Sequence, residues 1–413
     1  MLDLRLIRAE PDLVRAALAR RGADGPLDEI LALDERRRAL LTEVEGLRAE
    51  QNQASEAIAA AKRAGEDADD AIARMREVAS RVKALQAELD EVQRALDERM
   101  ALLPNLPAED APPQDTVIKA VGEGGRAGRD HLELAGPLID MERGANVSGS
   151  RFAYLLGDLV FLELALVRFA LDRLADEGFQ PVVPPALVRE RALFGTGFLP
   201  DTEQQLYTLP DDDLYLIGTS EVPLASLHAD EILEPADLPR RYAGFSPCFR
   251  REAGAAGKDT RGIFRVHQFD KVEMFVFCDP EEARAEHDRL LAIEESILQA
   301  LELPYRVVNI AVGDLGASAA KKYDCEAWIP SQERYREVTS TSNTTDFQAR
   351  RLDIRYRPGG GRPEHVHTLN GTAVAVGRTL IALLENGQRE DGSVALPAPL
   401  VDRGAPAAIG LYD

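Results

Sequence analysis

The sequence is poor in cysteine and in long apolar runs, and each shortage excludes a class of protein. Cys248, Cys278 and Cys325 are the only cysteines in 413 residues, and none belongs to a Cys-x-x-Cys pair. A disulfide framework and a cysteine-based zinc site are therefore excluded. The richest apolar stretch, 155–174, is interrupted by charged residues such as Asp158, which excludes a membrane-spanning helix.

The chain also lacks net positive charge. A net charge of −22 argues against general nucleic-acid binding, because phosphate backbones are bound by local concentrations of lysine and arginine. A basic groove on an acidic body stays possible, since net charge does not say where the basic side chains lie. The first ten residues contain no uninterrupted hydrophobic signal segment, so we expect a cytoplasmic protein.

Two long amphipathic helices are predicted near the N-terminus. Apolar residues recur at heptad-like spacing from Ile30 to Ala61 and again from Ala68 to Leu103, with Gly65-Glu66-Asp67 between the two runs. We expect an antiparallel coiled-coil hairpin over about 27–103, within a first domain that spans 1–104. Taken alone, such a hairpin is typical of a dimerisation or spacer element.

The rest of the chain is predicted to form one mixed domain. Pro104 and Pro107 break the second helix, and the acidic, proline-containing stretch after them predicts a linker over 105–129. From there, 130–413 alternates helices and strands without internal repeats.

The strongest motif is an arginine–glutamate pair, Arg250 and Glu252, at the end of an apolar run. A polar loop that contains Gly254 and Lys258 follows it, and a second apolar run ends at Glu273. Because strand side chains alternate, residues two apart on one strand share a face, so we expect a phosphate-binding guanidinium beside a carboxylate that accepts from an amine. The unit predicts an antiparallel strand–loop–strand that binds a phosphorylated ligand.

This unit resembles motif 2 of the class II aminoacyl-tRNA synthetases, and the run from Arg261 to Glu273 resembles the seryl-tRNA synthetases in particular. Motif 2 would span about 245–276. Helix and strand residues at about 172–188, with Pro185, resemble motif 1, and about 366–387 resembles motif 3. The resemblance implies an α+β fold: a mostly antiparallel catalytic sheet of six to seven strands, flanked by helices, with the N-terminal hairpin as an arm. The chain lacks only the tyrosine of the family's usual C-terminal ending.

The resemblance also implies roles for individual residues. Arg250 and Arg378 would be catalytic, with Arg250 between the α-phosphate of ATP and the substrate carboxylate, and Arg378 on the γ-phosphate. Glu252 would accept from the adenine amino group. Further contacts with ATP are predicted at Phe264, Val266, His267, Gln268, Phe269, Glu337, Val338, Thr339 and Ser340. Serine is predicted to bind at Thr219, Ser220, Glu221, Arg250, Glu273, Asn370 and Thr372.

Glu337 and Ser340 are the predicted Mg²⁺ ligands. Mg²⁺ prefers hard oxygen ligands and usually takes only one or two from the protein, with phosphates and water completing its shell. One carboxylate and one hydroxyl fit that preference.

The implied reaction is the ATP-dependent activation of L-serine and its transfer to the 3′ end of serine tRNA, with selenocysteine tRNA as a further candidate. The enzyme would be a homodimer through motif 1, and its N-terminal arm would hold the long variable arm of the tRNA. Residues 28–99 include 18 acidic and 12 basic residues, so useful positive charge must lie in one stripe. Its candidates are Arg48, Lys62, Arg63, Arg74, Arg76 and Arg81.

Three alternatives stay open at this point. The chain could be a pathway-dedicated paralogue that activates serine or a related amino acid, or a ligase that charges a carrier protein. Such paralogues tend to lack the arm that this chain retains. A catalytically inactive tRNA-binding protein is disfavoured by the intact set Arg250, Glu252, Glu337 and Arg378.

Overall fold

The computed structural model describes residues 1–65, 67–125, 127–200, 205–253, 257 and 259–410. The chain divides into two compact units. The first comprises Leu2–Ala19 and Ala23–Pro104, and the second comprises Asn105–Asp413 together with Met1 and Arg20–Gly22. Among the helices described, none is both long enough and apolar enough to cross a membrane.

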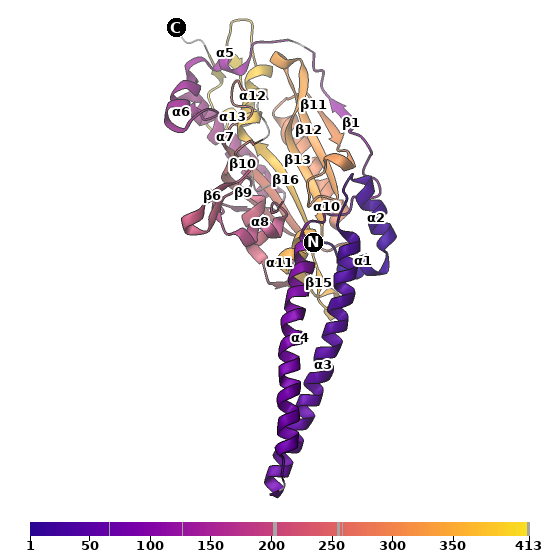
Figure 1. Ribbon diagram of the computed structural model, residues 1–413. Helices are drawn as coiled ribbons and strands as arrows, with labels where there is room; N and C mark the ends of the chain where they lie inside the picture. Colours follow the sequence, from indigo (N-terminus) through magenta and orange to yellow (C-terminus); the bar gives the residue numbers. More distant parts are fainter. Residues whose placement is uncertain (66, 126, 201–204, 254–256, 258, 411–413) are drawn as a thin grey trace. The chain divides into compact units, whose positions relative to one another are not determined.

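The first unit contains the predicted hairpin. Helices α1 (Leu4–Ala9) and α2 (Pro11–Arg20) precede α3 (Leu27–Ala64) and α4 (Asp69–Ala101), and the last two run side by side along their length (Figure 1). Helix α3 ends at Gly65, whose φ of 75° is easily adopted only by glycine. Glu66, which the sequence places in the turn, lies outside the described residues. The prediction of two long antiparallel helices is confirmed.

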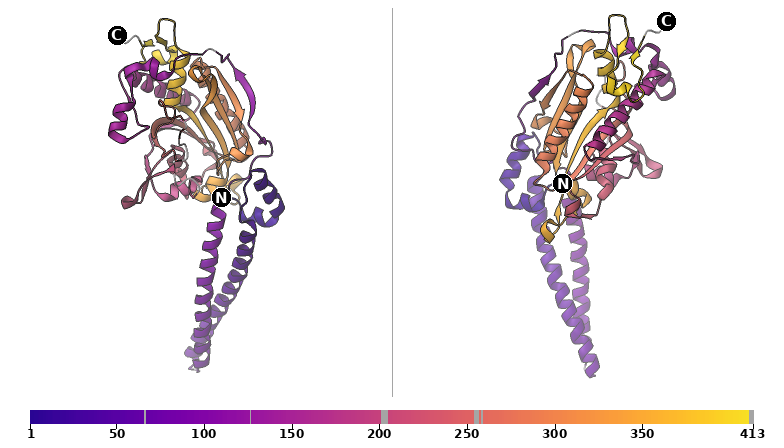
Figure 2. Two further views of the ribbon diagram at one scale, coloured as in Figure 1. Left: turned by 45° about the horizontal axis from the view of Figure 1, so that its top comes forward. Right: turned by 180° about the vertical axis from the view of Figure 1, so that it is seen from behind.

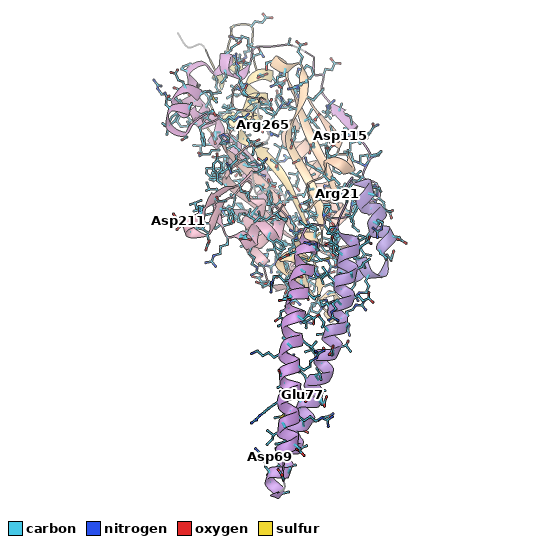
Figure 3. All side chains as sticks on the ribbon, viewed as in Figure 1. Arg21, Asp69, Glu77, Asp115, Asp211 and Arg265 are labelled. Carbon is cyan, nitrogen blue, oxygen red and sulfur yellow. The ribbon has the colours of Figure 1, made fainter. Side chains whose placement is uncertain are left out.

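An apolar seam holds these two helices together. Leu40 and Val44 of α3 pack with Leu85 of α4, and all three side chains are buried. Polar residues of α4 such as Asp69 and Glu77 are exposed (Figure 3). Since isolated helices are only marginally stable in water, packing of this narrow seam provides most of the stability of the hairpin.

The arm also contains a buried charge that the heptad pattern did not predict. The Asp34 side chain is only 1% exposed and pairs with Arg8 at 2.8 Å, Arg37 at 3.0 Å and Arg38 at 3.1 Å. Burial acts to raise the pKa of Asp34, but the hydrogen bonds from Arg37 and Arg8 outweigh it and lower the pKa. Loss of these partners would leave an uncompensated buried carboxylate.

The second unit is built on an eight-stranded sheet. Its strand order is β1-β11-β12-β13-β16-β10-β9-β4, and neighbouring strands are antiparallel except for the parallel pair β4 and β9. The strands are β1 (Thr116–Val121), β4 (Gln180–Val182), β9 (Arg240–Phe249), β10 (Gln268–Cys278), β11 (Tyr305–Asn309), β12 (Lys321–Ile329), β13 (Arg334–Thr345) and β16 (His367–Ala375).

The sheet confirms the mostly antiparallel class II fold and corrects the predicted strand count. Strand β1 lies inside the stretch 105–129, which the sequence predicted to be a linker. Its run Thr-Val-Ile-Lys-Ala-Val is rich in β-branched residues and pairs with β11 at the edge of the sheet. The acidic, proline-rich flanks concealed this signal.

The two faces of the sheet differ in what covers them. Helices α7 (Asp158–Asp176), α10 (Ala283–Ala300) and α12 (Val376–Asn386) share the main apolar core with one face, which includes Met274 and Val276 of β10 (Figure 2). Because strand side chains alternate, Glu273 and Phe275 point to the opposite face. That face carries α8 (Glu190–Thr196), α9 (Glu221–Ala225) and α11 (Phe347–Leu352) near one end.

The remaining elements are short and lie around this sheet. They are α5 (His131–Ala135), α6 (Met141–Ser148), α13 (Ala398–Val401), β2 (Ile139–Asp140), β3 (Tyr154–Leu155), β5 (Leu187–Val188), β6 (Tyr207–Leu209), β7 (Leu214–Leu216), β8 (Ile232–Leu233), β14 (Arg355–Tyr356), β15 (Glu364–His365), β17 (Val394–Ala395) and β18 (Ala408–Ile409). Where the family's terminal tyrosine is missing, Arg403 follows α13 and pairs with Asp172 of α7 at 3.0 Å.

The seam of the arm gives a direct stability test with adjacent leucines. Leu40 is fully buried, whereas Leu41 is 38% exposed. We expect Leu40→Ala to lower the free energy of unfolding of the arm by about 2–4 kcal/mol, because it removes packed methyl groups and leaves a cavity. Leu41→Ala, the matched control, should cost under about 1 kcal/mol. Urea unfolding followed by helical circular dichroism measures both, and equal losses would contradict the assigned seam.

Candidate active site

The site begins where strand β9 ends. β9 stops at Phe249, so Arg250 and Glu252 lie beyond the strand, and the prediction that they share one face of it is wrong. Glu252 adopts a φ of 50°, a left-handed conformation that costs energy in a residue other than glycine. This turn still brings both side chains to one cavity. Loop residues 254–256 and 258 lie outside the described residues.

A single cavity of about 420 Å³ collects most of the predicted site residues. It lies within the second unit, on the sheet face opposite the three long helices. Its lining includes Thr219, Glu221, Arg250, Glu252, Phe264, Val266, Phe269, Glu273, Glu337, Val338, Thr339, Ser340, Asn370, Thr372 and Arg378. Residues separated by more than 150 positions in the sequence thus converge on one concave surface.

Arg250 is held in place by the backbone and by an aromatic ring. Its Nε donates to the carbonyl oxygen of Gly218 at 3.1 Å, and its guanidinium carbon lies 5.3 Å from the centre of the Phe269 ring. The contact with Gly218 uses one of the five N–H donors of the guanidinium. The planar fork suits an anionic group with two oxygen atoms.

At one end of the cavity, two carboxylates form a small polar pocket. Glu273 Oε1 accepts from the Asn370 amide at 3.3 Å, and its Oε2 accepts from the Thr372 hydroxyl at 3.2 Å. A bulge at Ala373 in β16 brings Thr372 directly opposite Glu273. Glu221 accepts from the same Asn370 amide at 3.1 Å. The pocket therefore offers oxygen acceptors at a depth where little water competes.

Lys271 completes this pocket, and sequence reasoning missed it. Its ammonium group lies 2.5 Å from Glu273 Oε2 and 2.7 Å from Thr219 Oγ1, and the side chain is 7% exposed. The signal was available, because Lys271 precedes Glu273 by two residues on one strand and must share its face.

The pKa of Glu221 is strongly raised. Burial is the main cause, with the nearby charge of Glu273 adding to it, and together they raise the pKa of Glu221 to about 7. Gln348 of α11 opposes this effect by donating to Glu221 Oε1 at 2.7 Å. Glu221 is therefore near the midpoint of its titration at neutral pH, and a cationic ligand beside it would favour the ionised form.

The other end of the cavity carries Glu337, Ser340 and Arg378. On a regular strand, residues three apart face opposite sides, but β13 has a bulge at Val338 that brings both Glu337 and Ser340 to the cavity. Arg378 Nη1 lies 3.2 Å from Glu337 Oε2 and donates to the Glu337 carbonyl oxygen at 3.0 Å. Burial acts to raise the pKa of Glu337, but Arg378 and Lys322 outweigh it and lower the pKa to about 2.

An aromatic platform lies between the two ends. The guanidinium carbons of Arg336 and Arg378 lie 3.8 Å and 4.8 Å from the centre of the Phe264 ring. Glu252 pairs with Arg265 at 2.7 Å beside this ring. A flat ring next to a guanidinium and a carboxylate is an arrangement that can stack a heterocyclic base and accept from its amino group.

Three predicted residues do not line the cavity. Ser220 is fully buried and hydrogen-bonds Ser246 Oγ at 2.8 Å. His267 contacts the Arg250 carbonyl oxygen through Nδ1 at 2.9 Å and packs against Phe152, while Gln268 is exposed at the start of β10. Their predicted roles in binding ATP or serine remain predictions that this cavity does not support.

The donor set can be tested against Mg²⁺. Among the described residues, no group of three or more His, Cys, Asp and Glu side chains forms a metal cage. Glu337 keeps its charge down to low pH, and the bulge places it with Ser340 on the cavity side. Two hard oxygen donors beside an open cavity fit an ion that shares its ligands with phosphates and water.

Comparison with known proteins places this geometry in a family. Residues 1–107 match the model of the seryl-tRNA synthetase N-terminal domain, and 207–387 match that of the class II tRNA synthetase core domain for G, H, P, S and T. The chain is 54% identical to a serine–tRNA ligase from Acidothermus cellulolyticus and 52% identical to one from Thermobifida fusca, over 97% of this chain and 97% and 96% of theirs.

Solved structures agree with this match. A seryl-tRNA synthetase from Pyrococcus horikoshii, complexed with ATP, superposes with a TM-score of 0.92 at 44% identity and full coverage of both chains. A cytoplasmic serine–tRNA ligase from Naegleria fowleri, in complex with AMP, gives 0.88 at 32% identity over 100% of this chain and 99% of that one.

The raised pKa of Glu221 predicts a pH dependence of stability. The pKa of about 7 in the folded state exceeds the ordinary value of 4.5. The folded state therefore binds the Glu221 carboxyl proton more tightly than the unfolded chain does, and the protein loses stability as pH rises from about 4.5 to about 7. The loss amounts to about 3 kcal/mol for this shift. Glu221→Gln should remove most of it, so that the variant loses less stability than the wild type between pH 5 and pH 8.

Urea unfolding at pH 5 and pH 8 measures this difference. Glu390→Gln, which changes an exposed glutamate, is the matched control and should follow the wild type. If Glu221→Gln showed the same pH-dependent loss as the wild type, the ionisation of Glu221 would not be the cause.

Proposed function

The chain belongs to the seryl-tRNA synthetase family, and we propose how the side chains of its cavity perform the reaction of a serine–tRNA ligase. This class II enzyme joins serine to ATP to form seryl-adenylate and pyrophosphate, and then transfers serine to the 3′ end of its tRNA. One observation carries the residue assignment: Arg250 lies in the same cavity as the acidic pocket of Glu273 and the Glu337–Arg378 pair. The two reacting ligands can therefore meet at its guanidinium.

We assign the acidic pocket to serine. Glu273 and Glu221 would accept from the ammonium and hydroxyl groups, with Thr219, Asn370 and Thr372 closing a space suited to a small polar side chain. Lys271 would act as a positioning residue, because its ammonium pairs with Glu273 Oε2 at 2.5 Å and fixes that oxygen. A pocket that hydrogen-bonds a substrate hydroxyl discriminates strongly against alanine, whose binding would leave polar groups unpaired.

We assign the other half of the cavity to ATP. Phe264 would stack on the adenine, Glu252 would accept from its amino group, and Arg378 would bind the γ-phosphate. The lining residues Val266, Phe269, Val338 and Thr339 would complete the nucleotide contacts. Glu337 and Ser340 would hold Mg²⁺, which supplies neutralisation of phosphate charge when bound.

With both ligands bound, Arg250 would lie between the serine carboxylate and the α-phosphate. Its fork can donate to oxygens of both groups and stabilise the charge that develops as the carboxylate attacks phosphorus. The proposed route needs no covalent enzyme intermediate, since alignment and charge neutralisation account for the acceleration.

We also propose the partners. The helical arm, which matches the N-terminal domain of the family, would bind the long variable arm of serine tRNA, with selenocysteine tRNA as a second candidate. A homodimer would form through motif 1, in which Val183 after β4 is 81% exposed. Phe161 and Leu164, which lie before motif 1 on α7, are 58% and 57% exposed. Exposed apolar residues support an interaction surface that includes motif 1 and the first half of α7. A cytoplasmic location remains a prediction from the sequence.

The role of Arg250 predicts a large loss of activation. Arg250→Ala should slow serine-dependent ATP–pyrophosphate exchange by about 10² or more, the scale of losing one preorganised charge stabiliser. The neighbouring Arg251 is exposed and does not line the cavity, so Arg251→Ala is the matched control and should stay within about threefold of wild type. Near-normal exchange by Arg250→Ala would overturn its assignment.

The arm should be separable from activation. The start of α3 and the end of α4 meet through the pair Glu29–Arg99 at 2.6 Å, so a short linker can replace residues 30–103. We expect exchange within several-fold of wild type, because the cavity lies wholly in the second unit. Charging of serine tRNA, measured by acid-gel analysis, should fall below detection. Collapse of exchange would mean that the arm supports the catalytic fold, and normal charging would mean that the tRNA binds elsewhere.

A further inference from the structure

A buried pair, His131 with Glu385 of motif 3, has no place in the proposed chemistry. His131 is the first residue of α5 and is 5% exposed, and Glu385 near the end of α12 is 1% exposed. Burying polar side chains such as these lowers the stability of the fold unless each of their polar atoms has a hydrogen-bond partner.

The hydrogen bonds of Glu385 connect two other segments of the chain. Its Oε1 accepts from the His131 backbone N–H at 3.1 Å and lies 3.1 Å from His131 Nδ1, and its Oε2 accepts from the Ser331 backbone N–H at 2.9 Å. Ser331 belongs to the turn between β12 and β13. Glu385 thus ties α12, which carries Arg378, to the hairpin that carries Glu337.

A second contact assigns the tautomer of His131. Its Nε2 accepts from the backbone N–H of Ile263 at 3.3 Å and therefore carries no proton. The ring proton then lies on Nδ1, which donates to Glu385 Oε1. Ile263 immediately precedes Phe264, the aromatic platform of the cavity.

The loop that ends at Ile263 leaves space for the imidazole ring of His131. Gly262 has a φ of 77°, and a Cβ built on it would lie 2.1 Å from His131 Nε2. Any larger residue would push the imidazole away. Beside it, Arg261 pairs with Asp130 at 2.7 Å, so the end of the motif 2 loop rests on the start of α5 through two successive residues.

We propose that His131 and Glu385 are positioning residues for the nucleotide half of the cavity, an inference that rests on the assignment of that half to ATP. The pair joins the segments that carry Phe264, Arg378 and Glu337, and none of its side-chain hydrogen bonds reaches the acidic pocket around Glu273. Loss of the pair should therefore weaken ATP binding and leave serine binding nearly unchanged. A purely structural role would lower stability and affect both ligands alike.

Two amide variants separate the two nitrogens of His131. The amide nitrogen of His131→Asn can replace Nδ1 and donate to Glu385, but no atom then reaches Ile263. The amide oxygen of His131→Gln can replace Nε2 and accept from Ile263. We expect His131→Asn to raise the dissociation constant of ATP about tenfold, because the Ile263 N–H is left buried without a partner. His131→Gln should stay within about threefold of wild type.

Titration calorimetry with ATP alone and with serine alone measures these constants. The dissociation constant of serine should change less than about twofold in both variants. His228→Asn is the matched control, since His228 is also buried, at 6% exposure, and contacts Glu231 and Tyr242 outside the cavity lining. It should lower thermal stability without changing either constant.

Equal ATP affinity of His131→Asn and His131→Gln, or an equal loss of serine affinity, would overturn the inference. If His131→Asn does not fold, Gly262→Ala tests the same contact from the loop side, and wild-type ATP affinity in that variant would overturn it as well. Calorimetry measures ATP binding without any reaction, so it is independent of the exchange assay. A wild type that binds ATP but fails in serine-dependent exchange would refute the proposed function. The ATP affinities of the variants would still decide this inference.

Discussion

The need to pair charges in a partly dehydrated cavity constrains most of the charged residues of this site. A charged side chain that is removed from water without a partner costs several kcal/mol, so the charges that bind ligands must be compensated when the ligands are absent. Four ion pairs in or beside the cavity meet this need: Lys271–Glu273, Arg378–Glu337, Arg265–Glu252 and Arg336–Asp259. At these four pairs, ligand binding would be an exchange of partners, whereas Arg250, whose side chain donates only to the Gly218 carbonyl among the described residues, would gain new ones.

The position of the bulge in β13 is consistent with such an exchange of ion-pair partners. If Arg378 turned to a phosphate, Glu337 would retain Lys322 at 4.0 Å, and the bulge at Val338 places Glu337 beside Ser340, where Mg²⁺ would supply further positive charge. The pocket assigned to serine differs, because Lys271 and Glu273 are both buried and pair at 2.5 Å. The ammonium of serine would add to this existing ion pair.

The family motifs could be predicted from the sequence, because each is a short run whose residue types are dictated by chemistry. The helices of the arm were equally clear, since a heptad pattern is a local signal. Tertiary contacts were not visible: Asp34 is buried by the distant Arg8, and His131 meets Ile263 across 132 residues. Glu252 shows a different limit, because β9 ends at Phe249 and the φ of Glu252 is 50°, where alternation predicted a continuing strand.

The acidic arm raises the question of how it could bind an anionic RNA, and its ion pairs suggest an answer. Arg81 pairs with Glu43 at 3.1 Å and Arg48 donates to Gln86 at 3.0 Å, both across the two helices at exposed positions. Exposed pairs of this kind stabilise a protein by less than about 1 kcal/mol, so an arginine can leave its partner for a phosphate at little cost. Net charge therefore does not decide whether the arm binds RNA. What matters is how many arginines can be redirected to one side of the hairpin, and the carboxylates that they leave behind remain hydrated on the surface.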